Sequence, residues 1–341
     1  MKIKSFIIVL ISFLFFPEIS FSQDAQRLLR RATNSYYNEN YDRALSLLNE
    51  AIEADSTFAQ GYQARGIVLD AKGDFEEAIA DFEKAISLDS ALVNVYMNKA
   101  VTLVKLERYE RSLYILDKAL ELEPENMEIF FKRGEANFFA GNYEKAIEDL
   151  RKGLKADSEN WEAIYFKGLS HFYMGNNDLA LVNFNSFIEV NPYDKNAFYN
   201  RGLIHFEKGD FRKSIEDFNQ AIRIDNEFAG AFYNRAMAYE QLGNHRAAVF
   251  DLNNAAKISP EDASIFYSRA LNKYFLNEID GAIEDATKAI ELFDEYGDAY
   301  YIKGLALIRK GEIDEACDNF DMALELGLNL ALNAITANCG I

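Results

Sequence analysis

The sequence has few of the residues on which catalytic and metal sites depend. Its 341 residues include two cysteines and three histidines. His171 and His205 occupy equivalent places in a repeated pattern, but no third ligand accompanies them at a regular spacing. Phosphate-binding glycine loops, dinucleotide fingerprints and serine nucleophile motifs are absent from the sequence. The sequence therefore predicts a protein that is not an enzyme and that binds no cofactor and no metal.

Basic charge and flexible linkers are also scarce. Lysine and arginine number 36 against 55 aspartates and glutamates, so the net charge is −19. Binding to nucleic acid requires a basic face that neutralises phosphates, and this balance argues against it. There are four prolines and no Gly/Ser-rich tract. We therefore expect an acidic, structured protein whose partners do not include nucleic acid.

Residues 1–22 have the pattern of a secretory signal peptide. Two lysines precede the apolar run from Phe6 to Phe16, and the small-residue site Ser20-Phe21-Ser22 allows cleavage before Gln23. The run is shorter than the roughly 20 residues that span a bilayer, so a retained membrane anchor is the less favoured alternative. The phenylalanine-rich run resembles the signals of Gram-negative bacteria. We expect an exported protein, periplasmic or extracellular, without stable membrane insertion.

A pattern of 34 residues recurs through the rest of the chain. In one copy, Lys195 to Phe228, each half has the apolar spacing of an amphipathic helix. Gly209 lies where a left-handed residue would end the first helix, and Asp210 can cap the second. Each copy is therefore predicted to be a helix, a tight turn and a second helix.

Small residues recur at fixed positions when each copy is numbered from 1 to 34. Position 8 is Gly or Ala in all nine copies, and position 20 is Ala or Ser. Position 27 is Ala in seven of the nine, with Gly153 and Phe187 as exceptions. Antiparallel helices approach most closely where their side chains are small, so these positions predict the contact points within each pair.

This spacing of small and aromatic residues resembles the tetratricopeptide repeat, a helix-turn-helix unit that stacks into a superhelix. The resemblance implies an all-α superhelix, continuous along the chain, of about nine repeats and a short capping helix. The repeats, numbered 1 to 9 below, are expected at 25–58, 59–92, 93–126, 127–160, 161–194, 195–228, 229–262, 263–296 and 297–330, with the cap at 331–341.

Position 5 is aromatic in repeats 4 to 9, where it reads Phe131, Tyr165, Tyr199, Tyr233, Tyr267 and Tyr301. In the family this position lies on the concave surface beside positions 9 and 12, which in this chain are apolar and largely aromatic. A peptide or partner helix in such a groove would bury its anchors on the rings and meet hydrogen-bond donors from Asn200 and Asn234. The alternative is that the tyrosines pack against the first helix of the next repeat.

Lysine and arginine at position 7 have a different implication from those at positions 2 and 6. Position 7 is basic in all nine repeats and faces an aspartate at position 23 in five of them, so we expect structural ion pairs. The clamp with which chaperone-binding relatives hold a carboxylate is missing. Position 2 is never basic, position 6 offers only Arg30 and Lys132, and position 9 has no asparagine.

The resemblance implies a non-enzymatic scaffold that binds a protein or peptide of unknown identity in its groove. The alternative is a structural subunit of an envelope complex or a self-assembling scaffold. Peptide capture predicts that individual groove tyrosines matter, whereas assembly predicts sensitivity at the terminal repeats.

Cys317 and Cys339 are the only cysteines. Cys317 lies in the second helix of repeat 9 and Cys339 just after the expected capping helix. A chain that folds back at Gly327 would place them opposite each other, and an exported protein can meet an oxidising compartment. The sequence thus predicts a possible disulfide, with two unpaired thiols as the alternative.

Overall fold

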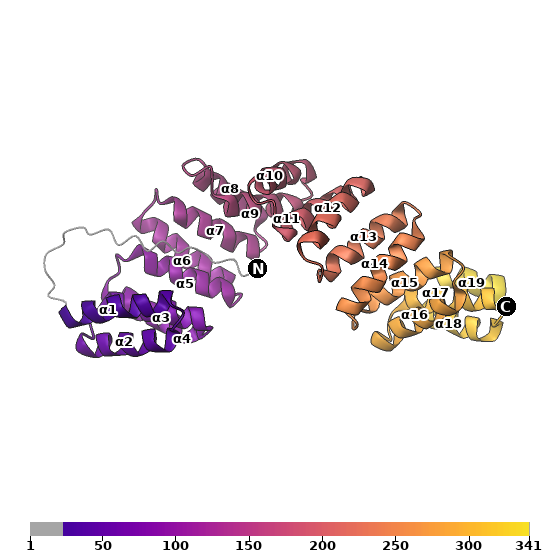
Figure 1. The fold of residues 1–341 in the computed structure, drawn as a ribbon, viewed down its shortest axis with the longest axis horizontal. Helices are drawn as coiled ribbons and strands as arrows, with labels where there is room; N and C mark the ends of the chain where they lie inside the picture. Colours follow the sequence, from indigo (N-terminus) through magenta and orange to yellow (C-terminus); the bar gives the residue numbers. More distant parts are fainter. Residues whose placement is uncertain (1–22, 341) are drawn as a thin grey trace. The chain divides into compact units, whose positions relative to one another are not determined.

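The structure is a computed structural model that describes residues 23–340, where it contains nineteen helices and no strand. Consecutive helices pack as antiparallel hairpins (Figure 1). The predicted fold class, an all-α array of helix-turn-helix repeats, is confirmed. No helix within residues 23–340 combines the length and the apolar character required to cross a bilayer. The predicted signal peptide, residues 1–22, lies outside the described residues.

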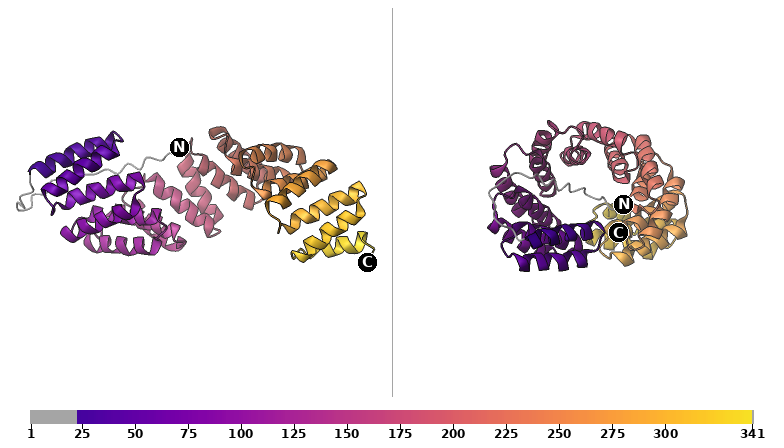
Figure 2. Two further views of the ribbon diagram at one scale, coloured as in Figure 1. Left: turned by 90° about the horizontal axis from the view of Figure 1, so that it is seen from below. Right: turned by 60° about the vertical axis from the view of Figure 1, so that its left-hand side comes forward.

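The chain divides into two compact units, one ending at Asp157 and the other beginning at Ser158. The continuity of the array across this boundary stays a prediction. The hairpins within each unit can be followed from two further directions in Figure 2. The first unit contains α1 (Gln23–Tyr37), α2 (Tyr41–Ala54), α3 (Ala59–Lys72), α4 (Phe75–Leu88), α5 (Val93–Lys105), α6 (Tyr109–Leu122), α7 (Met127–Phe139) and α8 (Tyr143–Leu154).

The second unit holds repeats 5 to 9 and a final helix. Its helices are α9 (Trp161–Tyr173), α10 (Asn177–Val190), α11 (Lys195–Glu207), α12 (Phe211–Ile224), α13 (Ala229–Gln241), α14 (His245–Ile258), α15 (Ala263–Phe275), α16 (Ile279–Leu292), α17 (Gly297–Lys310), α18 (Ile313–Glu325) and α19 (Leu330–Asn338).

The turn inside each hairpin has a left-handed residue at position 15. Gly209 has a φ of 77°, as predicted for a residue without a side chain. Glu107 (φ 57°) and Asn277 (φ 64°) adopt the same backbone at this position without being glycine. The predicted capping bond of Asp210 is wrong. Its side chain makes no capping bond to α12 and instead pairs with Lys213, at 3.1 Å between Oδ2 and Nζ.

Glycine at position 8 allows the two helices of a hairpin to touch. A Cβ atom added to Gly202 would lie 2.8 Å from Cε1 of Phe218, and one added to Gly304 would lie 2.5 Å from Cε1 of Phe320. Both phenylalanines are fully buried at position 24 of the same repeat. The small residue therefore makes the space that the large one fills.

In five repeats, the arginine at position 7 pairs with a buried aspartate of its own repeat and also contacts the repeat before it. In repeat 7, Arg235 donates from Nε to Asp251 Oδ2 at 2.7 Å and from Nη2 to Asp251 Oδ1 at 2.5 Å. Its Nη1 reaches Asn219 of repeat 6 at 2.5 Å. The predicted pairing is confirmed, and the same three-way contact recurs at Arg65, Arg133, Arg201 and Arg269.

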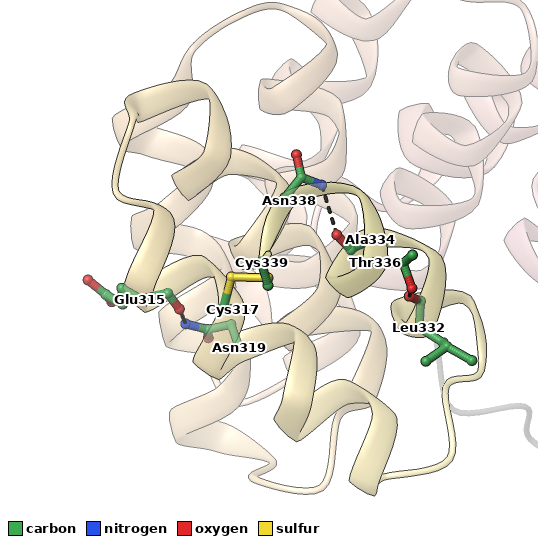
Figure 3. Close-up of a disulfide and its surroundings, with 8 residues drawn as sticks. All are labelled: Glu315, Cys317, Asn319, Leu332, Ala334, Thr336, Asn338 and Cys339. Carbon is green, nitrogen blue, oxygen red and sulfur yellow. Dashed lines mark hydrogen bonds between the residues drawn. A yellow bond between two sulfur atoms is a disulfide. The ribbon is translucent and has the colours of Figure 1, made fainter. Parts of the chain in front are cut away.

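The carboxyl-terminal helix covers the apolar end of repeat 9. Gly327 has a φ of 89°, and the chain turns back so that Ala331 and Ile335 of α19 pack against Phe320. Cys317 and Cys339 form a disulfide with 5.8 Å between their Cα atoms (Figure 3). The predicted pairing is confirmed, and the bond fixes α19 to α18.

Gly153, the exception at position 27 of repeat 4, leaves room for the ring of Phe131 at position 5. A Cβ atom on Gly153 would lie 2.3 Å from Cε1 of Phe131, which is buried. We expect Gly153→Ala to destabilise the first unit by about 1–3 kcal/mol, because an overpacked core must shift. Chemical denaturation followed by circular dichroism measures the loss.

Two variants test this explanation. Phe131→Leu should reduce the cost of Gly153→Ala, since the shorter side chain leaves room. Gly281→Ala is the matched control, because its added Cβ would meet only the flexible side chain of Lys273 and alanine favours a helix. Equal effects of the two glycine substitutions would contradict the packing explanation.

Candidate functional site

The first helices of the repeats line one side of the second unit. Helix α9 contacts α11, α11 contacts α13, and α15 contacts α17. The successive second helices of this unit, from α10 to α18, make no comparable contact with one another. The first helices therefore form the inner side of the local curve. We call the residues at positions 5, 9 and 12 of these helices the A-helix face: Tyr165, Leu169, Phe172, Tyr199, Leu203, Phe206, Tyr233, Met237, Glu240, Tyr267, Leu271, Tyr274, Tyr301, Leu305 and Ile308. All of them are partly exposed.

The tyrosine rings of this face rest on aromatic residues of their own repeat. The ring of Tyr199 lies 5.7 Å from that of Phe218 and 4.8 Å from that of Phe228, measured between centroids. The ring of Tyr165 contacts Phe184 edge to face at 5.7 Å and Phe187 in a tilted arrangement at 5.0 Å. These contacts fix each ring and leave part of it at the surface. Packing and partner binding are thus compatible at position 5.

Hydrogen bonds from an asparagine of the next repeat hold two of these tyrosines. Asn200 Nδ2 donates to Tyr165 Oη at 3.0 Å, and Asn234 Nδ2 donates to Tyr199 Oη at 2.9 Å. Asn234 Nδ2 also donates to the Gly230 carbonyl at 2.9 Å. Both amide hydrogens of Asn234 are therefore used inside the protein, and its predicted role as a donor to a partner is wrong. The two asparagines position Tyr165 and Tyr199, and a second role of Asn200 as a donor to a partner stays a prediction.

Because the tyrosine oxygen accepts the asparagine hydrogen, the hydroxyl hydrogen remains for another acceptor. Burial raises the pKa of Tyr165 and Tyr199, and it raises the pKa of Tyr267 to about 12. The hydroxyls therefore keep their hydrogens at neutral pH. The A-helix face presents oriented O–H donors among apolar side chains, which suits the carbonyl groups of a peptide.

Two predicted groove residues differ from the central tyrosines. Phe131 is only 8 % exposed and belongs to the first unit, where Gly153 makes room for its ring. The structure thus buries a ring that the sequence places in the groove, because Gly153 leaves space for it. Tyr301 lies on α17 at the far end of the A-helix face, with its ring 5.7 Å from Phe320.

Sequence reasoning missed the polar residues of this face. Glu240 occupies position 12 of repeat 7, where repeats 4, 5, 6 and 8 have an aromatic residue. Arg309 of repeat 9 stacks on Tyr274 at 3.8 Å from the ring centroid and donates to its carbonyl. The signal available in the sequence was the single carboxylate in an aromatic series.

The fold and this face define a class, the helical-repeat proteins whose stacked first helices form a continuous surface. Models of the tetratricopeptide repeat match residues 59–92, 97–160, 229–262 and 267–327, and a further TPR repeat model matches residues 202–243. The chain belongs to the tetratricopeptide repeat family. No curated protein sequence gives a match to the chain.

Two solved structures illustrate the likeness. A tetratricopeptide repeat protein from Parabacteroides merdae is 19% identical, with 73% of this chain and 99% of that chain covered and a TM-score of 0.57. The C-terminal part of a TPR repeat-containing protein from Cytophaga hutchinsonii is 16% identical, with 70% and 98% covered and a TM-score of 0.60. At these identities the likeness shows the fold alone.

Proposed function

We propose that this protein is a non-enzymatic scaffold that binds peptide segments of partner proteins on the A-helix face. The observation that carries the proposal is the row of tyrosines on this face, in which the oxygens of Tyr165 and Tyr199 accept from asparagines and keep a hydroxyl hydrogen to donate. An extended segment has one carbonyl per residue and alternating side chains, so it can accept from the hydroxyls and bury its apolar anchors between the rings.

The location of this activity is part of the proposal. We place the protein outside the cytoplasm, in the periplasm or the exterior of a Gram-negative cell. The pattern of residues 1–22 supports export, and the Cys317–Cys339 bond supports an oxidising compartment, since disulfides persist there.

Binding is tested with peptides selected by the protein itself. A displayed peptide library is selected on purified residues 23–341, and the affinities of the selected peptides are measured by calorimetry. Changing Tyr199 and Tyr233 together to Ala should weaken binding by about tenfold or more, because buried aromatic residues dominate interface energies. Circular dichroism checks that this variant, and the control variant described next, keep their helices.

The control is Phe250→Ala. Phe250 is a large aromatic residue on α14, a second helix, and is 65 % exposed. Its loss should leave peptide affinity unchanged. If the tyrosine variant binds normally while Phe250→Ala does not, the binding surface lies on the second helices; if the tyrosine variant loses its helices, the rings serve packing.

A further inference from the structure

Glu240 is a carboxylate placed among the rings of the A-helix face. It lies on α13 one helical turn beyond Met237, and its charge adds to burial and to Asp298 in raising the pKa of Tyr267 on the next first helix. The side chain is partly exposed and has no ion pair with any lysine or arginine of the described residues. Burial raises the pKa of Glu240, which reflects how far the carboxylate is removed from water.

A buried asparagine holds this carboxylate in place. Asn272 on α15 is fully buried and donates from Nδ2 to Glu240 Oε2 at 2.6 Å and to the Ser268 carbonyl at 2.8 Å. Its Oδ1 lies 2.9 Å from Nδ1 of His245, whose ring stacks on Phe275. One oxygen of Glu240 is thereby fixed, and the other accepts no hydrogen bond from residues 23–340. The position of the carboxylate is set before any ligand arrives.

The first unit contains the same arrangement with a cation added. Asp70, at position 12 of repeat 2, accepts from Thr102 Oγ1 at 2.7 Å, as Glu240 accepts from Asn272, and both donors lie 32 residues further along the chain. Asp70 also binds the ammonium of Lys105, which lies 35 residues after it. The residue 35 after Glu240 is Phe275, which has no charge. The carboxylate of repeat 7 thus lacks the cation that its counterpart has.

The surroundings favour a cation supplied from outside. Position 13 of repeat 9 has Arg309, and its guanidinium already lies on the ring of Tyr274. Glu162, Glu207 and Asp298, at positions 2 and 13 of the same helices, are exposed. A partly desolvated carboxylate beside tyrosine rings combines the two attractions that a guanidinium or ammonium group receives in a protein.

Resting on the proposed function, we propose that the A-helix face selects partner segments with an arginine or lysine whose cationic group pairs with Glu240. The aliphatic stem of that residue would lie along the rings of Tyr233 and Tyr267, and its apolar neighbours would occupy the flanking repeats. A carboxylate clamp selects an anionic group of its ligand, whereas Glu240 would select a cationic one.

The probe is a positional-scanning library of decapeptides with both ends blocked, so that no terminal charge contributes. Wild-type protein is compared with Glu240→Gln, whose side-chain oxygen can still accept from Asn272, and with Glu216→Gln, the same charge change on the exposed side of α12. We expect the wild type to prefer arginine or lysine at one position by about tenfold over glutamine, a preference that Glu240→Gln abolishes and Glu216→Gln keeps.

Every other outcome contradicts either the proposed function or the inference about Glu240. If no decapeptide binds the wild type, the proposed function fails and the inference with it. If apolar and aromatic peptides bind without a preference for a cation, or if Glu240→Gln retains that preference, the inference fails and the proposed function stands. A melting temperature of Glu240→Gln equal to that of the wild type shows that any lost preference is not a loss of folding.

Discussion

Replacing Arg235 by methionine is expected to destabilise the second unit by about 3 kcal/mol, because it leaves a buried carboxylate without its partner. Asp251 is 1 % exposed, and the Arg235 side chain is 14 % exposed, so solvent screens the pair little. Methionine keeps the apolar stem and removes the charge, the three donated hydrogen bonds and the contact of the guanidinium with the Phe232 ring. Denaturant unfolding of residues 23–341 measures the change.

The loss of stability in Arg235→Met should depend on pH. Burial raises the pKa of Asp251 even with Arg235 present, and without that arginine the shift would be larger. The folded state of the variant then binds the proton more tightly than the unfolded state does. Its deficit relative to wild type should therefore grow as the pH rises through the range of this carboxyl and shrink at acid pH.

Arg246→Met provides the comparison. Arg246 is exposed on the following helix, α14, and has no ion pair in the described part of the chain. Its loss should change the free energy of unfolding by less than about 0.5 kcal/mol. Equal stability of the two variants would show that the Arg235–Asp251 pair contributes nothing measurable to the free energy of unfolding. Adding Asp251→Asn to Arg235→Met should restore part of the loss, since an amide costs less to bury than a charge.

Removing the disulfide should release the carboxyl-terminal helix. The bond closes a loop with a sequence separation of 22, and in the chain-entropy model a loop of this size contributes about 3 kcal/mol. In Cys317→Ser/Cys339→Ser, α19 retains only the apolar contacts of Ala331, Ala334 and Ile335. We expect the backbone amides of α19 to exchange with deuterium faster, while those of α13 keep their protection.

Reduction of the wild type by dithiothreitol is the matched experiment, because it breaks the same bond without a substitution. It should accelerate exchange in α19 to the same extent as the double variant. Alkylation of unreduced protein from its native compartment gives an independent test. Two alkylated thiols would show that the bond does not form there, and unchanged exchange in α19 would show that it does not hold the helix.

The sequence determined the architecture because a repeated pattern constrains each helix locally. Small residues at positions 8 and 20, an apolar stripe on each half and glycine at position 15 specify a hairpin without reference to distant residues. The ion pairs of position 7 followed from the same register, because the aspartate recurs 16 residues later. The disulfide could be predicted because a single turn, at Gly327, separates its two helices.

Only the tertiary structure decided what each polar group of the A-helix face does. The sequence places Asn234 and Tyr199 on one face, but whether the amide points to a partner or to the tyrosine depends on the distance between adjacent repeats. Phe131 and Tyr165 are equivalent by position, and the space beside Gly153 buries one of them. The pairing of Glu240 with Asn272 joins position 12 of one repeat to position 10 of the next, as in the Asp70–Thr102 pair, and it forms only because adjacent repeats stack at the required distance. Local periodicity fixes helices and turns, whereas the partners of polar side chains depend on how neighbouring repeats stack.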